Sequence, residues 1–280
     1  MTAVNPARLS IASNLALTKR ETNMIDRRTF SAGLVAAVAT SLLRDPSEAQ
    51  AAVSARNVVL VHGAYADGSS WSEVIGRLQA AGLRTTAVQN PLTSLTDDVA
   101  ATQRALAMQD GPTVLVAHSY GGMVVCQAGV DPKISALVYV AARAPDAGEN
   151  YTALAAKFPT PPASAGLVTS DGYAQLNESA FLNDFANGVA SNKASELYAV
   201  QAPISATLFS TAKTTVAAWR SKPSWYAVSK QDRTISPDLE RFMAKRMKAT
   251  TIEVDAGHLS LISHAQEISD LILAAAGRSG

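Results

Sequence analysis

The sequence contains a single cysteine, Cys126, among its 280 residues. One cysteine cannot form an intramolecular disulfide, and it excludes the zinc sites that are built from several cysteine ligands. The four histidines do not show the HExxH spacing of a metalloprotease. The sequence therefore indicates no metal site, and we expect the protein to work without a cofactor.

An excess of charge of one sign is also missing. The chain has 24 basic and 23 acidic side chains, a formal net charge of +1. Proteins that bind nucleic acids carry a clear excess of basic residues, so this balance argues against a nucleic-acid partner. Hydrophobic residues make up 48% and charged residues 17% of the chain, which is the composition of an ordinary globular protein.

The apolar run near the N-terminus, Phe30 to Leu43, is shorter than the roughly 20 residues that a membrane-spanning helix needs. Arg27-Arg28 precedes this run, and Ala49-Gln50-Ala51 follows it. A charged segment, an apolar segment and small residues in this order predict a twin-arginine-type signal peptide over residues 1–51, with Met24 as a second candidate start. We therefore expect a periplasmic or secreted protein without stable membrane insertion, or a cytoplasmic one if the signal prediction is wrong.

Short apolar runs alternate with helical patterns over most of the remaining chain. This alternation predicts an α/β fold with a doubly wound, mostly parallel sheet of about six strands covered by helices on both faces. The alternation lapses over 145–222, where Asp171 to Ala217 has a helical pattern, so we expect a helical lid insertion between core segments 52–144 and 223–280. The expected strands are 58–61, 84–88, 113–117, 134–140, 224–228 and 250–254, and the expected helices are 71–81, 95–108, 120–130, 237–247 and 266–275.

A serine joins one of these strands to the helix that follows it, in the segment Val116 to Gly122. A serine at this point sits on a tight turn above the sheet, with small residues on either side where the backbone passes close to other strands. The segment matches the nucleophile elbow G-x-S-x-G, with Ala117 in place of the first glycine. It predicts Ser119 as a nucleophile.

A serine hydroxyl needs a base to accept its proton. His258 is the best candidate, because it follows the last expected strand and its loop can reach back over the sheet. The base in turn needs a carboxylate to orient it, and Asp232 and Asp146 each follow a strand. We favour Asp232, which gives the chain order Ser119, Asp232, His258.

Acyl transfer also needs two donors for the developing oxyanion. The backbone N–H of Tyr120, the residue after the nucleophile, is one expected donor. The glycine-containing loop His62 to Gly68 follows the first strand, and we expect the N–H of Ala64 in this loop to be the other.

These segments together resemble the α/β-hydrolase superfamily, and more narrowly the compact branch of plant methyl-ester esterases, hydroxynitrile lyases and their bacterial relatives. The resemblance covers residues 56–280 and implies the same triad and oxyanion positions as the residues above. Two departures are Ala117 in the elbow and the absence of early strands before Val58, so the sheet should have fewer than the full eight strands. The segments that carry the resemblance are Leu60 to Ala64, Gly68 to Trp71, His118 to Gly122, Asp232 to Ile235 and Gly257-His258.

The leading hypothesis is a serine hydrolase that cleaves carboxylic esters through an acyl-enzyme. One alternative is a hydroxynitrile-lyase-like C–C lyase on the same scaffold, and another is a ligand-binding homologue without turnover. The expected partner is a small-molecule ester, whose identity the sequence leaves open, together with the oligomeric state.

Overall fold

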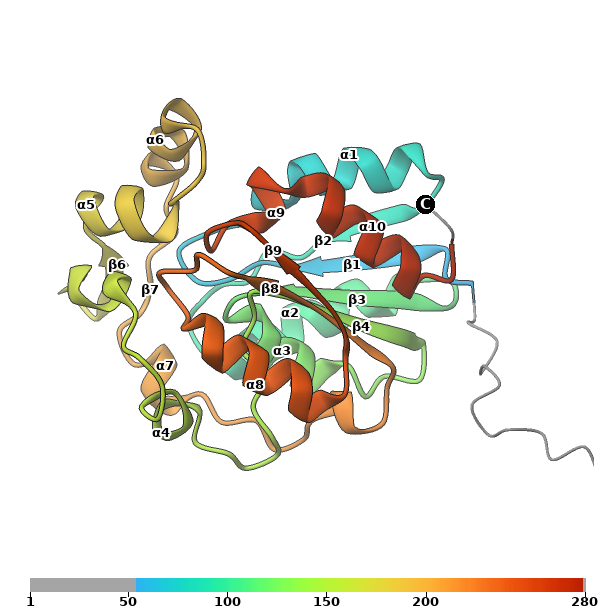
Figure 1. The fold of residues 1–280 in the computed structure, drawn as a ribbon. Helices are drawn as coiled ribbons and strands as arrows, with labels where there is room; N and C mark the ends of the chain where they lie inside the picture. Colours follow the sequence, from blue (N-terminus) through green and yellow to red (C-terminus); the bar gives the residue numbers. More distant parts are fainter. Residues whose placement is uncertain (1–53, 279–280) are drawn as a thin grey trace, which may run out of the picture. The chain divides into compact units, whose positions relative to one another are not determined.

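The computed structural model describes residues 54–278 of the chain. The predicted signal peptide, residues 1–51, lies outside the described residues. Six parallel strands form the main sheet in the order β2-β1-β3-β4-β8-β9 (Figure 1). They are β1 (Asn57–Val61), β2 (Arg84–Ala87), β3 (Thr113–His118), β4 (Ile134–Val140), β8 (Ser224–Ser229) and β9 (Thr250–Val254).

Helices cover both faces of this sheet (Figure 1). Every residue of β1 and β3 is buried, as expected for strands that lie between two helical layers. One face carries α1 (Ser72–Ala80), α9 (Ser260–Ser263) and α10 (Ala265–Ala275); the other carries α2 (Leu95–Ala107), α3 (Gly121–Ala128) and α8 (Pro237–Met247). The predicted core strands and helices, and the sheet of about six strands, are therefore confirmed.

The strand order reverses next to β1. The chain leaves β1 to form β2 on one side and returns to form β3 on the other, so the carboxyl ends of β1 and β3 lie side by side. Open α/β sheets bind their ligands outside the strand ends at such a reversal. The loop after β1 and the turn after β3, which hold the predicted oxyanion donors and Ser119, meet at this point.

The segment between β4 and β8 is not purely helical, so the helical expectation for Asp171 to Ala217 was wrong in part. Three short strands form an antiparallel sheet in the order β5-β6-β7. Asp171 and Gly172, with φ of 53° and 79°, make the two-residue turn between β5 and β6. An Asp-Gly pair is a strong hairpin signal, and it was outweighed by the helical spacing around it. The segment contains α4 (Tyr151–Ala155), β5 (Leu167–Ser170), β6 (Tyr173–Leu176), α5 (Glu178–Ala180), a π-helical turn (Phe181–Phe185), α6 (Ser191–Ala199), β7 (Ile204–Ser205) and α7 (Leu208–Thr211).

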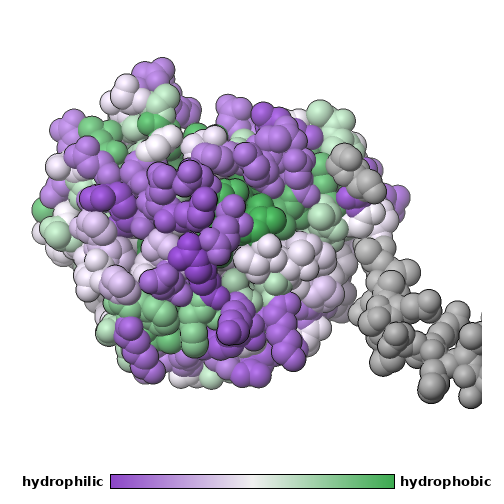
Figure 2. Space-filling view, in the orientation of Figure 1, coloured by the Kyte–Doolittle hydropathy of each residue, from purple (hydrophilic) through white to green (hydrophobic). Residues whose placement is uncertain are grey.

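The surface view shows that the face carrying α8 and α10 is largely hydrophilic, with smaller hydrophobic areas between the polar ones (Figure 2). Within residues 54–278, no helix combines the length and the apolar character that a bilayer crossing requires.

Candidate active site

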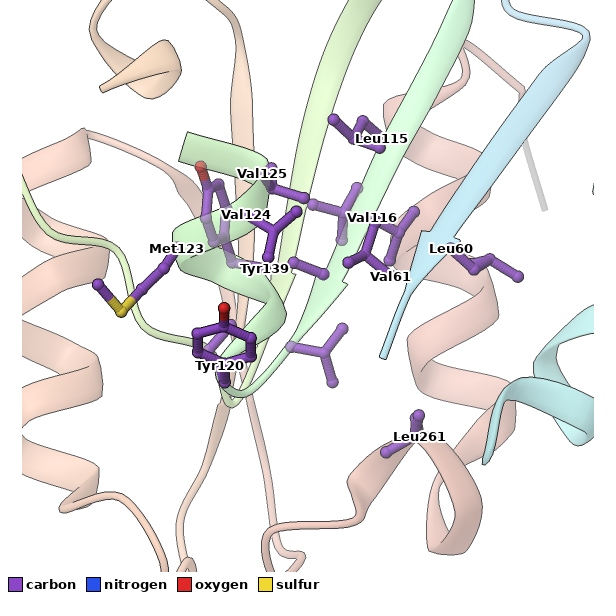
Figure 3. Close-up of a cluster of buried hydrophobic side chains, with 14 of the residues drawn as sticks. Leu60, Val61, Leu115, Val116, Tyr120, Met123, Val124, Val125, Tyr139 and Leu261 are labelled. Atoms are coloured by element: carbon purple, nitrogen blue, oxygen red, sulfur yellow. The ribbon is translucent and has the colours of Figure 1, made fainter. Parts of the chain in front are cut away.

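Ser119 lies on the tight turn between β3 and α3. Figure 3 shows this connection, with Leu115 and Val116 on the strand, Tyr120 at the turn and Met123 on the helix. The φ of Ser119 is 52°, in the left-handed region. A residue other than glycine in such a conformation costs about 1–3 kcal/mol and persists only where its surroundings enforce it.

Three backbone hydrogen bonds hold Ser119 in this conformation. Its N–H donates to the Val140 carbonyl oxygen at 3.2 Å, and its own carbonyl oxygen accepts from Gly122 at 3.0 Å and from Arg143 at 2.9 Å. Two of these partners belong to β4 and the loop after it. The turn is therefore fastened to the neighbouring strand as well as to its own helix.

The turn also requires small residues around the serine. A Cβ atom on Gly121 would come within 2.8 Å of the Val61 carbonyl oxygen, and one on Gly122 would overlap the Arg143 carbonyl oxygen. Ala117 is fully buried at the end of β3, where its methyl group is accommodated. The replacement of the first motif glycine by alanine is therefore compatible with the elbow geometry.

Asp232 and His258 are brought together from the loops after β8 and β9. His258 Nδ1 lies 2.5 Å from Asp232 Oδ2, and neither side chain is exposed to solvent. Asp232 Oδ1 accepts from the N–H groups of Thr234 at 2.6 Å and Ile235 at 2.8 Å. An ionised carboxylate only accepts, so the proton of a neutral His258 ring sits on Nδ1 and the lone pair sits on Nε2. Nε2 is buried and makes no hydrogen bond within residues 54–278.

His258 is placed beside the elbow by its ring contacts. Its ring centroid is 4.7 Å from that of His118, the residue before Ser119, and 5.3 Å from that of Phe185 in the insertion. His118 Nε2 donates to the His258 carbonyl oxygen at 3.1 Å. In the described residues no hydrogen bond joins Ser119 Oγ to His258 Nε2. Such bonds are often long without substrate and shorten in the Michaelis complex.

His62 shapes the loop after β1. Its Nε2 accepts from the Asn90 N–H at 2.9 Å, so its Nδ1 carries the proton that is donated to the Gly63 carbonyl oxygen at 2.8 Å. Burial lowers the pKa of His62, which favours this neutral form. A neutral, doubly hydrogen-bonded ring thus fixes the backbone where the loop begins.

This loop runs directly against the serine. A Cβ atom on Gly63 would lie 2.7 Å from Ser119 Cβ, so only glycine allows the approach. The next N–H belongs to Ala64, and neither this group nor the N–H of Tyr120 donates to an acceptor within residues 54–278. Two unused backbone donors therefore remain on the two segments that flank Ser119.

The other carboxylates near these strand ends have different partners. Asp146, which the sequence left as an alternative, accepts from Arg220 Nε at 2.6 Å. Asp255 accepts from the side chain of Gln231 at 2.9 Å. Of the three, Asp232 is the one hydrogen-bonded to His258.

Asp98 is a buried residue that the sequence reasoning missed. Its carboxylate accepts from the Tyr120 hydroxyl at 2.7 Å and from the Leu92 N–H at 2.8 Å, and burial raises its pKa. It supports the residue that follows Ser119. Asp98 and Thr102 follow Leu95 by three and seven residues, so all three lie on the buried face of α2. This spacing is the sequence signal that could have revealed Asp98.

A metal-binding cluster is not found in the part of the chain that the structure describes, since no three His, Cys, Asp or Glu side chains there are grouped to hold an ion.

The sequence model of the alpha/beta hydrolase family matches residues 58–271 of this chain. The chain belongs to the α/β-hydrolase family. The match spans the sheet, the elbow, the insertion and the loops of Asp232 and His258.

Similar proteins include several with esterase names. A carbendazim hydrolyzing esterase from Nocardioides sp. is 32% identical over 128 residues, which cover 40% of this chain and 52% of that protein. Esterase PIR7B from Oryza sativa subsp. japonica is 26% identical over 267 residues, or 80% of this chain and 97% of that one. The crystal structure of polyneuridine aldehyde esterase has a TM-score of 0.67 at 19% identity, covering 78% and 98% of the two chains. The aligned part thus spans about half the length of the Nocardioides relative but nearly all of the rice one.

Proposed function

We propose that this protein is a serine hydrolase that cleaves carboxylic esters through an acyl-enzyme. The observation that carries the proposal is the hydrogen bond of 2.5 Å between Asp232 and His258, beside a Ser119 held at a φ of 52°. The esterase names of two curated relatives support the choice of an ester as substrate.

In the proposed mechanism Ser119 Oγ attacks the ester carbonyl and His258 Nε2 takes its proton. Asp232 keeps the Nδ1 proton in place and stabilises the imidazolium that forms. The N–H groups of Ala64 and Tyr120 bind the oxyanion of the tetrahedral intermediate. Both donors are backbone groups in segments that are held in place by hydrogen bonds. They therefore need little reorganisation when negative charge develops on the carbonyl oxygen.

The intermediate then collapses, and His258 gives its proton to the leaving alcohol. The acyl group remains on Ser119 Oγ until water, deprotonated by His258, attacks it and restores the serine. One aromatic side chain of the insertion, Phe185, packs on the His258 ring at a centroid distance of 5.3 Å. We infer that the insertion is a lid that limits the access of water and shapes the ester pocket.

The test measures turnover of 4-nitrophenyl butyrate and labelling by a fluorophosphonate. Ser119→Ala is expected to keep the fold and to lower kcat by about 10⁶-fold, the loss typical of a missing nucleophile, and to abolish labelling. Near-normal turnover by this variant would refute the assignment.

A matched pair of variants tests the carboxylate in the same assay. Asp232→Asn is expected to lower kcat by about 10⁴-fold, because the asparagine no longer holds the reactive tautomer of His258. Asp146→Asn removes a carboxylate bound to Arg220 and is expected to leave kcat within a few-fold of the original. Product analysis of a cyanohydrin with the same proteins distinguishes hydrolysis from lyase chemistry.

A further inference from the structure

Arg143 is placed against the elbow by its own backbone. It follows β4, and its N–H donates to the carbonyl oxygen of Ser119 at 2.9 Å. Burial raises the pKa of Tyr65 to about 12, and the charge of Arg143 acts in the opposite direction. Burial also raises the pKa of Tyr120, again opposed by Arg143. The guanidinium lies over the ring of Phe209, whose centroid is 6.3 Å from that of Tyr65 and 5.9 Å from that of Tyr120. It is therefore close to both segments that carry the proposed oxyanion donors.

The guanidinium is held between aromatic rings of the insertion. Its central carbon lies 3.9 Å from the ring centroid of Phe209, in α7, and 4.8 Å from that of Tyr151, in α4. Stacking of this kind fixes the plane of an arginine and leaves its N–H edges available for hydrogen bonds.

Those N–H groups have no acceptor in the described part of the chain. Arg143 makes no ion pair or side-chain hydrogen bond within residues 54–278, and its Nε is buried without a partner. Arg220 is a useful contrast, because it also stacks on a ring, that of Trp219 at 5.0 Å, but is paired with Asp146. A stacked, half-buried cation without a counter-ion is unusual, since buried donors are normally satisfied.

Arg143, whose backbone is hydrogen-bonded to Ser119, lines a cleft of about 260 Å³. Most of the lining is apolar, and no acidic side chain is among the described residues that form it. Thr234 also lines the cleft, and its Oγ1 is a second buried polar atom without a partner. The backbone N–H of Thr234 donates to Asp232, so the cleft lies beside the Asp232–His258 pair.

We propose that this cleft binds a carboxylate carried by the ester substrate, with the Arg143 guanidinium and the Thr234 hydroxyl as its donors. This assignment rests on the proposed esterase function and narrows it to esters that bear a second, ionised carboxyl group. A guanidinium presents paired N–H donors that match the two oxygens of a carboxylate. The scissile carbonyl of the same substrate would lie at Ser119, which is hydrogen-bonded to the Arg143 backbone.

The test compares matched esters that differ by one carboxylate. One pair places the charge in the acyl half, mono-4-nitrophenyl adipate against 4-nitrophenyl hexanoate. The other places it in the alcohol half, 3-carboxyphenyl butyrate against phenyl butyrate. The protein is expected to prefer the charged member of at least one pair by about 10- to 100-fold in kcat/KM, the range of a hydrogen bond to a charged group. The pair that responds identifies the half of the ester that enters the cleft.

Arg143→Met is expected to reduce this preference at least tenfold, mainly through KM of the charged ester, and Arg143→Lys is expected to restore part of it. Arg220→Met, which removes a stacked but paired arginine, is expected to keep the preference. A purely structural arginine would lower both members of a pair alike and leave their ratio unchanged. If Arg143→Met does not fold by thermal melting, Thr234→Val provides the same ratio measurement.

The outcomes separate the two proposals. If the neutral esters are hydrolysed and Ser119 is labelled, but charged members are not preferred or the preference survives Arg143→Met, the carboxylate site is overturned and the esterase stands. If no ester is hydrolysed and Ser119 is not labelled, the esterase function falls and the carboxylate site falls with it.

Discussion

At the scale of single residues, the conformation of Ser119 is imposed by its neighbours. A serine has no preference of its own for a φ of 52°, and three backbone hydrogen bonds, two of them to β4 and the loop after it, maintain it. Gly63, in the loop after β1, packs directly against this serine. A Cβ atom placed on Gly63 would lie only 2.7 Å from the Cβ of Ser119. The position of Ser119 therefore depends on its neighbours in β4, in α3 and in the loops after β1 and β4.

Glu240 is a second buried carboxyl behind the Asp232–His258 pair. Its Oε2 accepts from the Ser229 N–H at 3.0 Å, and the side chain is fully buried. Burial first, and then the negative charge of Asp232, raise the pKa of Glu240 well above its usual range. The raised pKa favours the protonated, neutral form of Glu240, which reduces the negative charge beside Asp232.

This raised pKa predicts how the free energy of unfolding depends on pH. The unfolded chain releases the Glu240 proton near the ordinary value of 4.5, whereas the folded chain holds the proton to a higher pH. The unfolded state then binds fewer protons, so Glu240 lowers stability increasingly as the pH rises above that value. Glu240→Gln, which has no proton to lose, is expected to gain in Tm relative to the original protein between pH 4 and pH 9. Each unit of pKa corresponds to about 1.4 kcal/mol, or roughly 3–5 °C in a chain of this size.

Thermal melts of both proteins at pH 4, 7 and 9 measure this gain. Glu253→Gln is the control of opposite sign, because hydrogen bonding from Arg241 lowers the pKa of Glu253, an exposed residue. That variant should be slightly less stable than the original protein at pH 7 and pH 9, and the difference should shrink as the pH falls below 4.5. A constant difference between Glu240→Gln and the original protein at all three pH values would contradict the raised pKa.

At the scale of elements, the elbow depends on the close approach of α3 to the loop after β4. Alanine normally stabilises a helix relative to glycine by about 0.5–1 kcal/mol. Gly122 in α3 should behave in the opposite way, because its Cβ would overlap the Arg143 carbonyl oxygen. Gly122→Ala is expected to lower stability by about 1–3 kcal/mol and to reduce ester turnover, since Arg143 and Ser119 share a hydrogen bond.

Gly76→Ala is the matched control for this prediction. Gly76 lies within α1, and a Cβ there would meet no atom within 4 Å. This variant is expected to raise Tm by about 1–4 °C and to leave turnover unchanged. If both alanine variants shift Tm in the same direction, the contact between a Cβ at position 122 and the Arg143 carbonyl oxygen is not destabilising, and the prediction is wrong.

The core elements could be predicted from the sequence because the four central strands, β1, β3, β4 and β8, are almost entirely buried. Such strands appear as continuous apolar runs, and the serine turn follows one of them with small residues at fixed offsets. The hairpin of β5 and β6 was missed because its strands are exposed or alternate, so their apolar content resembles that of an amphipathic helix. The sequence feature that distinguishes this hairpin from a helix is the Asp171-Gly172 pair. Both residues adopt the positive φ angles that a two-residue hairpin turn requires.

The candidate site was partly accessible in the same way. Ser119, Asp232 and His258 each follow a strand, so their approximate location comes from topology. Arg143 and Glu240 could not be recognised, because their significance lies in what surrounds them. A missing counter-ion and a desolvated carboxyl are properties of the packed molecule, and sequence spacing does not record which side chains are left without partners.

At the scale of the whole molecule, hydrogen bonds join the first residues of the described fold to parts of the chain that are distant in sequence. Ala55 is fully buried, and its N–H donates to the Ala276 carbonyl oxygen, at the end of α10, at 3.0 Å. Asn57 begins β1, and its side-chain amide donates to Asp110 at 3.0 Å. The first described residues therefore connect the last helix to the central strands of the sheet.

These contacts predict where the chain can be shortened, which also bears on the proposed export signal. A chain that starts at Ala52, as expected after signal removal, retains Ala55 and Asn57 and should match the full chain in Tm and in kcat/KM for 4-nitrophenyl butyrate. A chain that starts at Val58 loses both hydrogen bonds, each of which contributes about 0.5–1.5 kcal/mol, and should melt several degrees lower. Failure of the Ala52 chain to fold would mean that residues 1–51 contribute to the folded protein, which a removable signal peptide cannot do.

The predicted export signal has a test of its own in the arginine pair. Replacement of Arg27 and Arg28 by lysine is expected to keep the active protein from reaching the periplasm, because the twin-arginine route recognises the arginine pair and carries folded proteins. Unchanged activity in the periplasmic fraction would contradict the prediction of a twin-arginine signal.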